Sequence, residues 1–222
     1  LAPVLARLDA SGLPRILFVS HGRGGGVARH IADLAELLRG HAEVLLLQPD
    51  TPASLVLRVL RPGEHLLLWF PRADWERLVG FRRALGIAGR HSPPADGLPA
   101  TILELPSRLG CPHGLTLHDF YPACPAYNLA GTAGRFCGGG AACGRCLEGR
   151  WAVWPLSIGQ WREAFGALLA SAERVIAPSH DAANRLRVFH PGIVPVVWPH
   201  PERAPAPPGR PLRVLVPAPS PP

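Results

Sequence analysis

The sequence contains no methionine and no lysine, and both absences narrow what the chain can be. All 23 basic residues are arginines, so the lysine that a phosphate-binding P-loop requires is missing and that kind of site is excluded. Together with 27 prolines, this usage is typical of a GC-rich genome, so the +7 net charge permits an acidic partner but does not establish one. Because Leu1 is not an initiator, we expect the chain to be an internal fragment.

Long apolar runs are also missing. The longest, such as Leu66–Phe70, have the length of a strand, whereas a membrane-spanning helix needs roughly 18 apolar residues. Leu1–Ala10 includes charged residues and lacks the apolar core of a secretory signal. We therefore expect a cytoplasmic protein, with contact to the inner face of the membrane that is at most peripheral. The arginines are dispersed and not interleaved with aromatics, so no nucleic-acid partner is expected.

Periodicity predicts an α/β fold. Hydrophobic residues make up 47% and charged residues 18%, which suits a buried core. Short apolar runs alternate with helical patterns, as in a Rossmann-like parallel sheet with helices on both faces. The predicted strands are Ile16–Val19, Val44–Leu47, Leu66–Phe70, Thr101–Leu103, Leu115–Leu117, Val175–Ala177 and Val194–Val197. The predicted helices are Val27–Leu38, Asp74–Leu85, Ile158–Ala170 and Ala182–Phe189, the last with Ser179 as its N-cap.

Composition also divides the chain. Residues 1–198 are expected to form one Rossmann-like domain, interrupted by an irregular cysteine-rich insert at about 120–150. Residues 199–211 are rich in proline and read as an interdomain linker, after which 212–222 would begin a truncated second domain. Ligands of open parallel sheets bind at the carboxyl ends of the strands, so the loops after Val19, Leu117 and Ala177 are the expected site.

A glycine loop follows the first predicted strand. Gly24, Gly25 and Gly26 lie between that strand and the first helix, where backbone N–H groups and the helix dipole favour a phosphate or diphosphate. Val27 stands where the dinucleotide-binding fingerprint has its third glycine, which disfavours a nicotinamide-dependent oxidoreductase. A tight turn without a ligand is the alternative interpretation.

Three segments, taken in order, resemble one family. They are Arg15–His30 with the glycine loop, Leu115–Pro122 with His118 and Asp119, and Arg174–Ser179 followed by Pro199–Pro201. Together they resemble the N-terminal domain of bacterial retaining glycosyltransferases of the GT-B fold, known as group 1 or family 4-like. The polar segment Arg90–Gly97 departs from the pattern, where a strand end and a loop facing the acceptor are expected.

The resemblance implies a transferase whose cleft lies between two Rossmann-like domains. The missing C-terminal domain would hold most contacts to the nucleotide-sugar donor, so the fragment is expected to be inactive alone. The glycine loop would face the donor diphosphate or a glycan, polysaccharide or lipid-linked acceptor. His118 would lie beside the reacting sugar, and Asp119 would fix the loop or orient that histidine. No cofactor is required for such chemistry. A non-catalytic ligand-binding module is the alternative.

The insert contains four closely spaced cysteines. Cys124, Cys137, Cys143 and Cys146 follow the pattern C-x12-C-x5-C-x2-C, and the last pair has the spacing of a zinc knuckle. A structural zinc ion held by four thiolates would explain how a long irregular loop stays ordered. Reduced thiols, disulfides, a redox pair and an iron–sulfur cluster remain alternatives. Cys111 lies outside this group and reads as an ordinary buried thiol.

Overall fold

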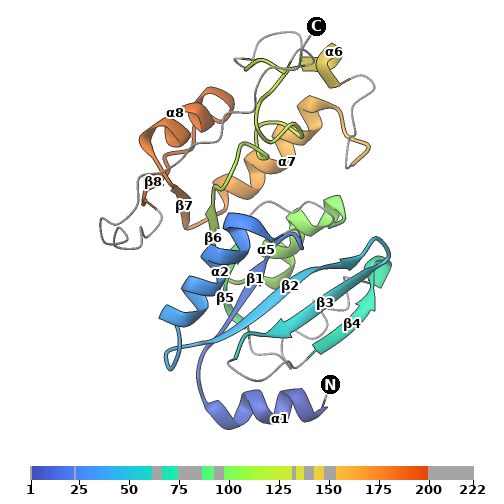
Figure 1. Cartoon of the computed structure of the whole chain (residues 1–222), viewed down its shortest axis with the longest axis vertical. Coiled ribbons are helices and arrows are strands. Elements are labelled where there is room, and N and C mark those ends of the chain that lie inside the picture. Colours follow the sequence, from blue (N-terminus) through green and yellow to red (C-terminus); the bar gives the residue numbers. More distant parts are fainter. Residues whose placement is uncertain are drawn as a thin grey trace, which may run out of the picture.

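The computed structural model describes residues 2–22, 24–61, 67–74, 87–92, 98–131, 134–137, 143–147 and 154–199. One eight-stranded sheet in the order β4-β3-β2-β1-β5-β6-β7-β8 organises this part of the chain (Figure 1). Its strands are β1 Arg15–Val19, β2 Glu43–Thr51, β3 Ser54–Val59, β4 Leu67–Pro71, β5 Ile87–Ser92, β6 His113–Thr116, β7 Arg174–Ala177 and β8 Val196–Val197.

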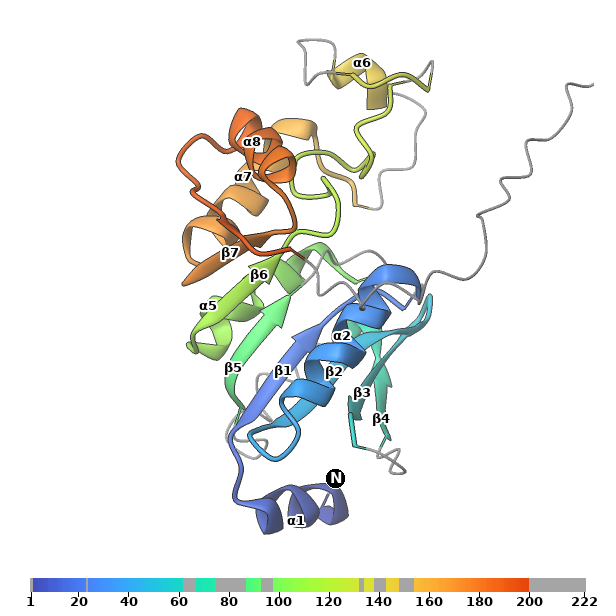
Figure 2. The same ribbon diagram turned by 60° about the vertical axis from the view of Figure 1, so that its left-hand side comes forward.

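Helices connect and cover these strands. They are α1 Ala2–Ser11, α2 Gly25–Leu37, η1 Arg72–Asp74, η2 Ala100–Glu104, α5 Leu105–Leu109, α6 Cys143–Leu147, α7 Ile158–Ala170 and α8 His180–Phe189, with η marking 3-10 helices. In both Figure 1 and Figure 2, α1 lies beyond one end of the sheet and α6 beyond the other. None of the helices described is long and apolar enough to cross a membrane.

The expected α/β fold is confirmed, with one addition. The pairs β1–β2, β1–β5, β5–β6, β6–β7 and β7–β8 are parallel, as expected for this fold, although β5 was not among the predicted strands. Strands β3 and β4 are antiparallel and extend the sheet as an edge hairpin; β4 matches the strand predicted at Leu66–Phe70, whereas β3 and the antiparallel pairing were not predicted. Only Pro52 and Ala53 separate β2 from β3, far too few for the crossover that a parallel pair needs, so the chain must turn back.

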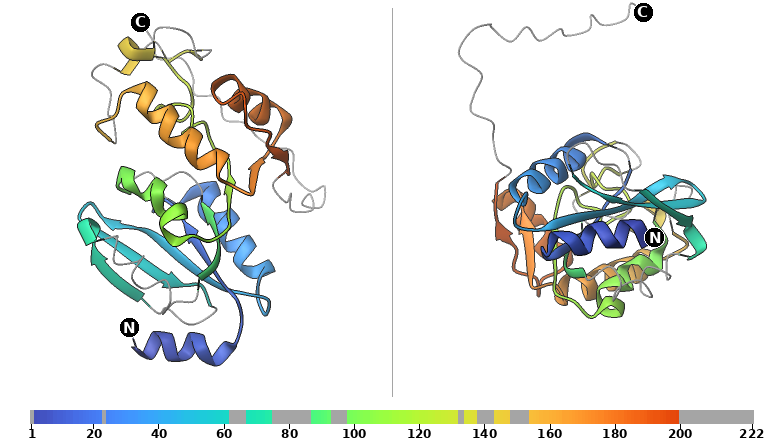
Figure 3. Two further views of the ribbon diagram at one scale, coloured as in Figure 1. Left: turned by 180° about the vertical axis from the view of Figure 1, so that it is seen from behind. Right: turned by 90° about the horizontal axis from the view of Figure 1, so that it is seen from below.

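Hydrophobic side chains cover both faces of the sheet. Because side chains alternate along a strand, Leu17 and Val19 of β1 point into the larger core, while Ile16 and Phe18 point into a second, smaller one. The smaller core is closed by Val27 and Ile31 of α2. The larger core is closed by η2, α5 and α7, and Figure 3 (right) shows these elements across the sheet from α2. Helices on both faces are therefore confirmed.

Several sequence predictions differ from the structure or fall outside the described residues. The strand predicted at Thr101–Leu103 is wrong, because these residues belong to η2, which packs Ile102 into the core. The last strand is shorter than predicted and covers only Val196–Val197; Pro195 before it has no N–H to donate to a ladder. The helix predicted over Asp74–Leu85 and the proposed linker and second domain fall almost entirely outside the described residues.

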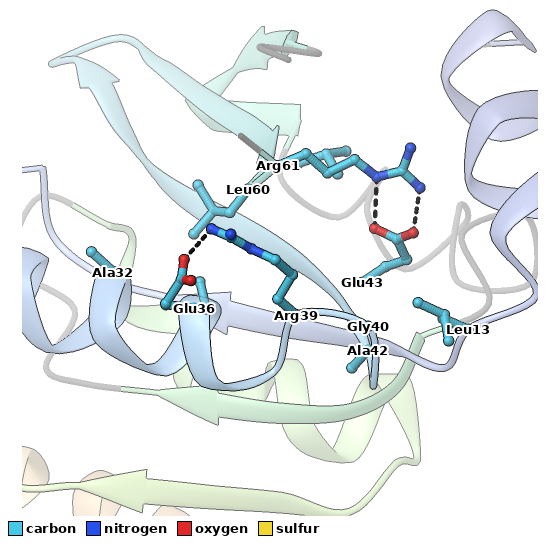
Figure 4. A pocket seen from close by; sticks show the side chains of 11 residues that line it. Leu13, Ala32, Glu36, Arg39, Gly40, Ala42, Glu43, Leu60 and Arg61 are labelled. Carbon is cyan, nitrogen blue, oxygen red and sulfur yellow. Dashed lines mark hydrogen bonds and ion pairs between the residues drawn. The ribbon is translucent and has the colours of Figure 1, made fainter. Parts of the chain in front are cut away.

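At the amino ends of β1 and β2 lies a cavity of about 420 Å³ (Figure 4). A bidentate ion pair flanks it, in which Arg61 donates from Nε and a terminal nitrogen to the carboxylate of Glu43. Glu43 is 5% exposed, and the hydrogen bond from Arg61 lowers the pKa of its carboxyl, against the opposing effect of burial. Glu36 and Arg39 form a second ion pair at the rim, but both side chains are exposed.

The buried ion pair makes stability depend on pH. A carboxyl whose pKa is lowered by folding stabilises the protein fully above its unfolded pKa, near 4.5, and loses that contribution as the pH falls through the folded value. We expect Glu43→Gln to lower the free energy of unfolding at pH 7 by about 1–2 kcal/mol, with a deficit that shrinks below pH 4.5. Urea unfolding across pH checks this.

Glu36→Gln is the matched control, because it removes a carboxylate from the same cavity rim at an exposed ion pair. Such pairs contribute little, so this variant should change the free energy of unfolding by less than about 0.5 kcal/mol. Equal effects of the two substitutions would contradict the structural role assigned to Glu43.

Candidate functional site

The loops singled out from the sequence meet at one edge of the sheet. Strands β1, β6 and β7 are parallel, so their carboxyl ends face the same way. Hydrogen bonding continues just past two of them: the Ser20 N–H donates to the Leu47 carbonyl at 3.0 Å, and the Leu117 N–H to the Ile176 carbonyl at 2.8 Å. The backbone is therefore fixed up to the residues that enter the glycine loop and to His118. The cavity at the amino ends lies at the opposite edge.

Different physical constraints require glycine at several positions around the start of α2. A Cβ on Gly22 would lie 2.8 Å from the Pro49 carbonyl oxygen, so this position is set by close packing against the end of β2. Gly24 and Gly25 have φ angles of +75° and +71°, which favour glycine whatever the space around them. The sequence interpretation named the later glycines and missed Gly22, because its contact is with a residue far along the chain.

Gly26 stands apart from its neighbours. A Cβ there would meet no atom within 4 Å, and no positive φ is recorded for it. Neither packing within the described residues nor backbone conformation requires glycine at this position. It lies in the first turn of α2, where free N–H groups and the positive end of the helix dipole favour an anion. Among the described residues nothing crowds this position, which leaves room for a ligand to approach the backbone.

His118 contacts α2 through a second histidine. The ring centroids of His30 and His118 lie 5.0 Å apart at an interplanar angle of 67°, an edge-to-face arrangement. Both side chains are half-buried. His30 lies in α2, the helix that follows the glycine loop, so the contact joins that helix to the end of β6. The sequence interpretation did not single out His30, although its position, one turn into the helix after the glycine loop, could have indicated a place near the site.

The residues after His118 are tied to the core. The Asp119 Oδ1 accepts a hydrogen bond from the Tyr121 N–H at 2.9 Å, which closes a turn of the type that Asp commonly forms. The Tyr121 ring is buried and packs edge-to-face on Trp154, Trp161 and Phe165. The Trp161 indole also donates to the Tyr121 carbonyl at 2.8 Å. This hydrogen bond holds the Asp119 side chain against the turn that follows His118.

Two other histidines are fully buried and have structural contacts. His113, at the amino end of β6, places Nε2 3.2 Å from the Leu168 carbonyl oxygen. His190 places Nε2 3.1 Å from the Pro122 carbonyl oxygen, and burial lowers the pKa of its ring. These side chains hold backbone segments together inside the core. Among the three, His118 is the one at the carboxyl end of a strand.

The five cysteines all lie in the described part of the chain, where no disulfide joins them, and they differ in exposure. Cys124 is buried, Cys143 and Cys146 are half-buried, and Cys137 is exposed. The last pair opens the short helix α6, which the sequence interpretation did not predict. In the described part of the chain, no three or more His, Cys, Asp or Glu side chains are grouped as around a metal ion. Cys111 is half-buried and packs against the larger core.

The fold is a Rossmann-like α/β domain with a glycine loop and a histidine at the carboxyl ends of its parallel strands. Residues 24–201 match the family model of Glycosyltransferase Family 4, which spans most of the chain. The chain belongs to Glycosyltransferase Family 4. Its substrates are accordingly a sugar donor and an acceptor. None of the curated proteins compared with the chain matches it significantly.

The glycine loop gives a direct test of these assignments. We expect Gly22→Ala to lower the free energy of unfolding by about 1–3 kcal/mol, because the new Cβ collides with a backbone oxygen. Gly26→Ala meets no neighbour and lies in a helix, so it should leave stability unchanged or raise it by up to about 1 kcal/mol. Denaturant unfolding of the two variants measures both. A destabilised Gly26→Ala protein would show that this glycine has a structural role.

Proposed function

We propose that this chain is the N-terminal, acceptor-side half of a retaining, sugar-nucleotide-dependent glycosyltransferase. The observation that supports it most directly is the contact between His30 and His118, which brings the helix after the glycine loop and the end of β6 together. Donor diphosphate and reacting sugar are adjacent parts of one molecule, so a protein that binds both needs an anion site next to a sugar site.

The glycine loop is proposed to face the diphosphate of the donor or the acceptor. Transfer of the sugar builds negative charge on the departing diphosphate, and N–H groups preorganised at a helix start stabilise such charge. Gly24, Gly25 and Gly26 are all exposed, so these N–H groups are accessible from solvent. A side chain at Gly26 would project into the space that the ligand needs.

His118 is proposed to lie beside the transferred sugar and to donate a hydrogen bond to it or to the phosphate. An imidazole suits this role because it can donate from one nitrogen while the other is held in place. Asp119 is proposed to support it by fixing the turn that follows, through its hydrogen bond to the Tyr121 N–H. The transfer needs no metal in the cleft.

The remaining parts of the reaction are assigned to a second domain. We infer that residues 199–211 link to it, that it holds most of the nucleotide, and that the present chain is inactive alone. The acceptor is proposed to be a glycan, a polysaccharide or a lipid-linked sugar of a bacterial cell surface. A basic chain of net charge +7 suits work at the inner face of a membrane, where anionic headgroups attract arginine.

His118→Ala in the full-length protein tests the catalytic part of this proposal. We expect kcat to fall about 100-fold or more, because a hydrogen bond made at the reacting centre is lost. The free energy of unfolding should change by no more than about 1 kcal/mol, since the ring is only half-buried. Steady-state kinetics with a panel of sugar nucleotides and denaturant unfolding give the two numbers.

His113→Asn is the matched control, because it changes a histidine at the other end of the same strand. Its ring is buried against the Leu168 carbonyl, so this variant should lose stability and keep kcat in the folded fraction. A His118→Ala protein that loses stability and turnover in equal measure would contradict the catalytic role.

A further inference from the structure

Outside the proposed cleft, the insert after β6 gathers around a small hydrophobic cluster of its own. We call it the insert cluster: Ala123, Cys124 and Leu129 are buried in it, and Phe120, Ala126, Leu147 and Phe189 pack against it. It is separate from the two cores that cover the sheet. Only three side chains are buried in this cluster, and two of them are small, so it gives little hydrophobic stabilisation. An irregular insert of about 30 residues therefore needs a cross-link to hold one conformation.

Cys137 returns to this cluster through a tight loop. Its N–H donates to the Leu129 carbonyl at 2.8 Å, next to an antiparallel bridge between Ala130 and Phe136. The Phe136 ring lies under the guanidinium of Arg185 in α8, 4.5 Å from the ring centroid. Cys137 therefore enters the loop beside Leu129, which shares the insert cluster with Cys124.

Cys143 is brought to the same place by Arg162 of α7. The guanidinium donates from Nε to the Ala123 carbonyl at 3.0 Å and from a terminal nitrogen to the Cys143 Sγ at 3.3 Å. It also lies 4.8 Å from the centroid of the Phe189 ring, so its position is held from a third side. One arginine thus links Cys143, the first residue of α6, to Ala123, the residue just before Cys124.

Cys146 lies close to Cys143 because both are in the short helix α6. It lies three residues after Cys143 in a helix, so the two side chains share one face. The next residue, Leu147, packs against the insert cluster.

We propose that the four insert cysteines, Cys124, Cys137, Cys143 and Cys146, bind one structural zinc ion. Zinc prefers four thiolates in a tetrahedron, often with one pair spaced C-x2-C, and such sites are closed to water and substrate. Each thiol releases its proton on binding, which leaves a net charge of −2 on the zinc and its four ligands. The guanidinium of Arg162, already hydrogen-bonded to Cys143, offsets part of that charge.

Binding would draw the four sulfurs together, including that of the exposed Cys137. Metal sites of this kind assemble as the metal binds, so the thiols need not be grouped beforehand. The consequence reaches the cleft, because the backbone runs from His118 to Cys124 in only six residues. Zinc at the insert cluster and Trp161 at Tyr121 would together fix the segment that leaves His118. This inference does not depend on the sugar transferred.

Metal analysis of the reduced, purified chain tests the proposal. We expect about one zinc per chain by elemental analysis, and release of that zinc when four thiols have reacted with an organomercurial. Alkylation followed by mass spectrometry should find the four insert cysteines protected with zinc and reactive after chelation. Cobalt offered in place of zinc should give the absorption bands of tetrahedral thiolate coordination, a readout that does not depend on how a variant folds.

Cys111→Ser is the matched control for the double variant Cys143→Ser with Cys146→Ser. The control should keep its zinc, and the double variant should lose at least tenfold in zinc affinity. Absence of zinc, fewer than five free thiols in the unreduced denatured chain, or iron in place of zinc would each overturn the proposal. Equal zinc content in the double variant and the control would overturn it as well.

Discussion

The hydrogen bond from the Trp161 indole to the Tyr121 carbonyl is the constraint on which the proposed site depends most. It lies inside an aromatic cluster that Trp154 and Phe165 complete, so water does not compete for it. On one side of His118 the chain is held by the ladder between β6 and β7, and on the other side by this anchor. A side chain between two fixed points needs little further ordering when a substrate binds.

The amino and carboxyl ends of the parallel strands, which form two opposite edges of the sheet, have different roles. At the amino edge a buried carboxylate is paired with Arg61, and this pairing serves stability. At the carboxyl edge the glycine loop exposes backbone N–H groups, and one glycine, Gly26, is required by neither packing nor conformation. Parallel sheets place ligands at their carboxyl edge, which agrees with this division. The cavity beside Glu43 is therefore better explained by packing than by substrate binding.

Much of the fold could be predicted from local patterns. Trp161, Phe165 and Leu168 share a helical face and are all buried in α7, and the Ser179 side chain accepts from the Ala182 N–H as predicted for an N-cap. The strand predicted at Thr101–Leu103 is wrong, because so short a run with two apolar residues does not distinguish a strand from a 3-10 turn.

The site was harder to predict than the fold. A run of glycines marks a loop, but the collision that fixes Gly22 depends on Pro49, and the His30–His118 contact joins two residues that lie far apart in the chain. Such contacts follow from the order of strands in the sheet, which a single sequence does not state. The cysteine spacing, in contrast, is local and could be read directly, although the part played by Arg162 could not.

Hydrogen exchange of the full-length protein with and without its sugar-nucleotide donor tests the central claim, that the carboxyl edge binds substrate. We expect slower exchange in peptides covering residues 20–27 and 117–121, with no change in a peptide covering 36–43 at the cavity beside Glu43. Protection of the 36–43 peptide alone, with a donor that the enzyme turns over, would contradict it.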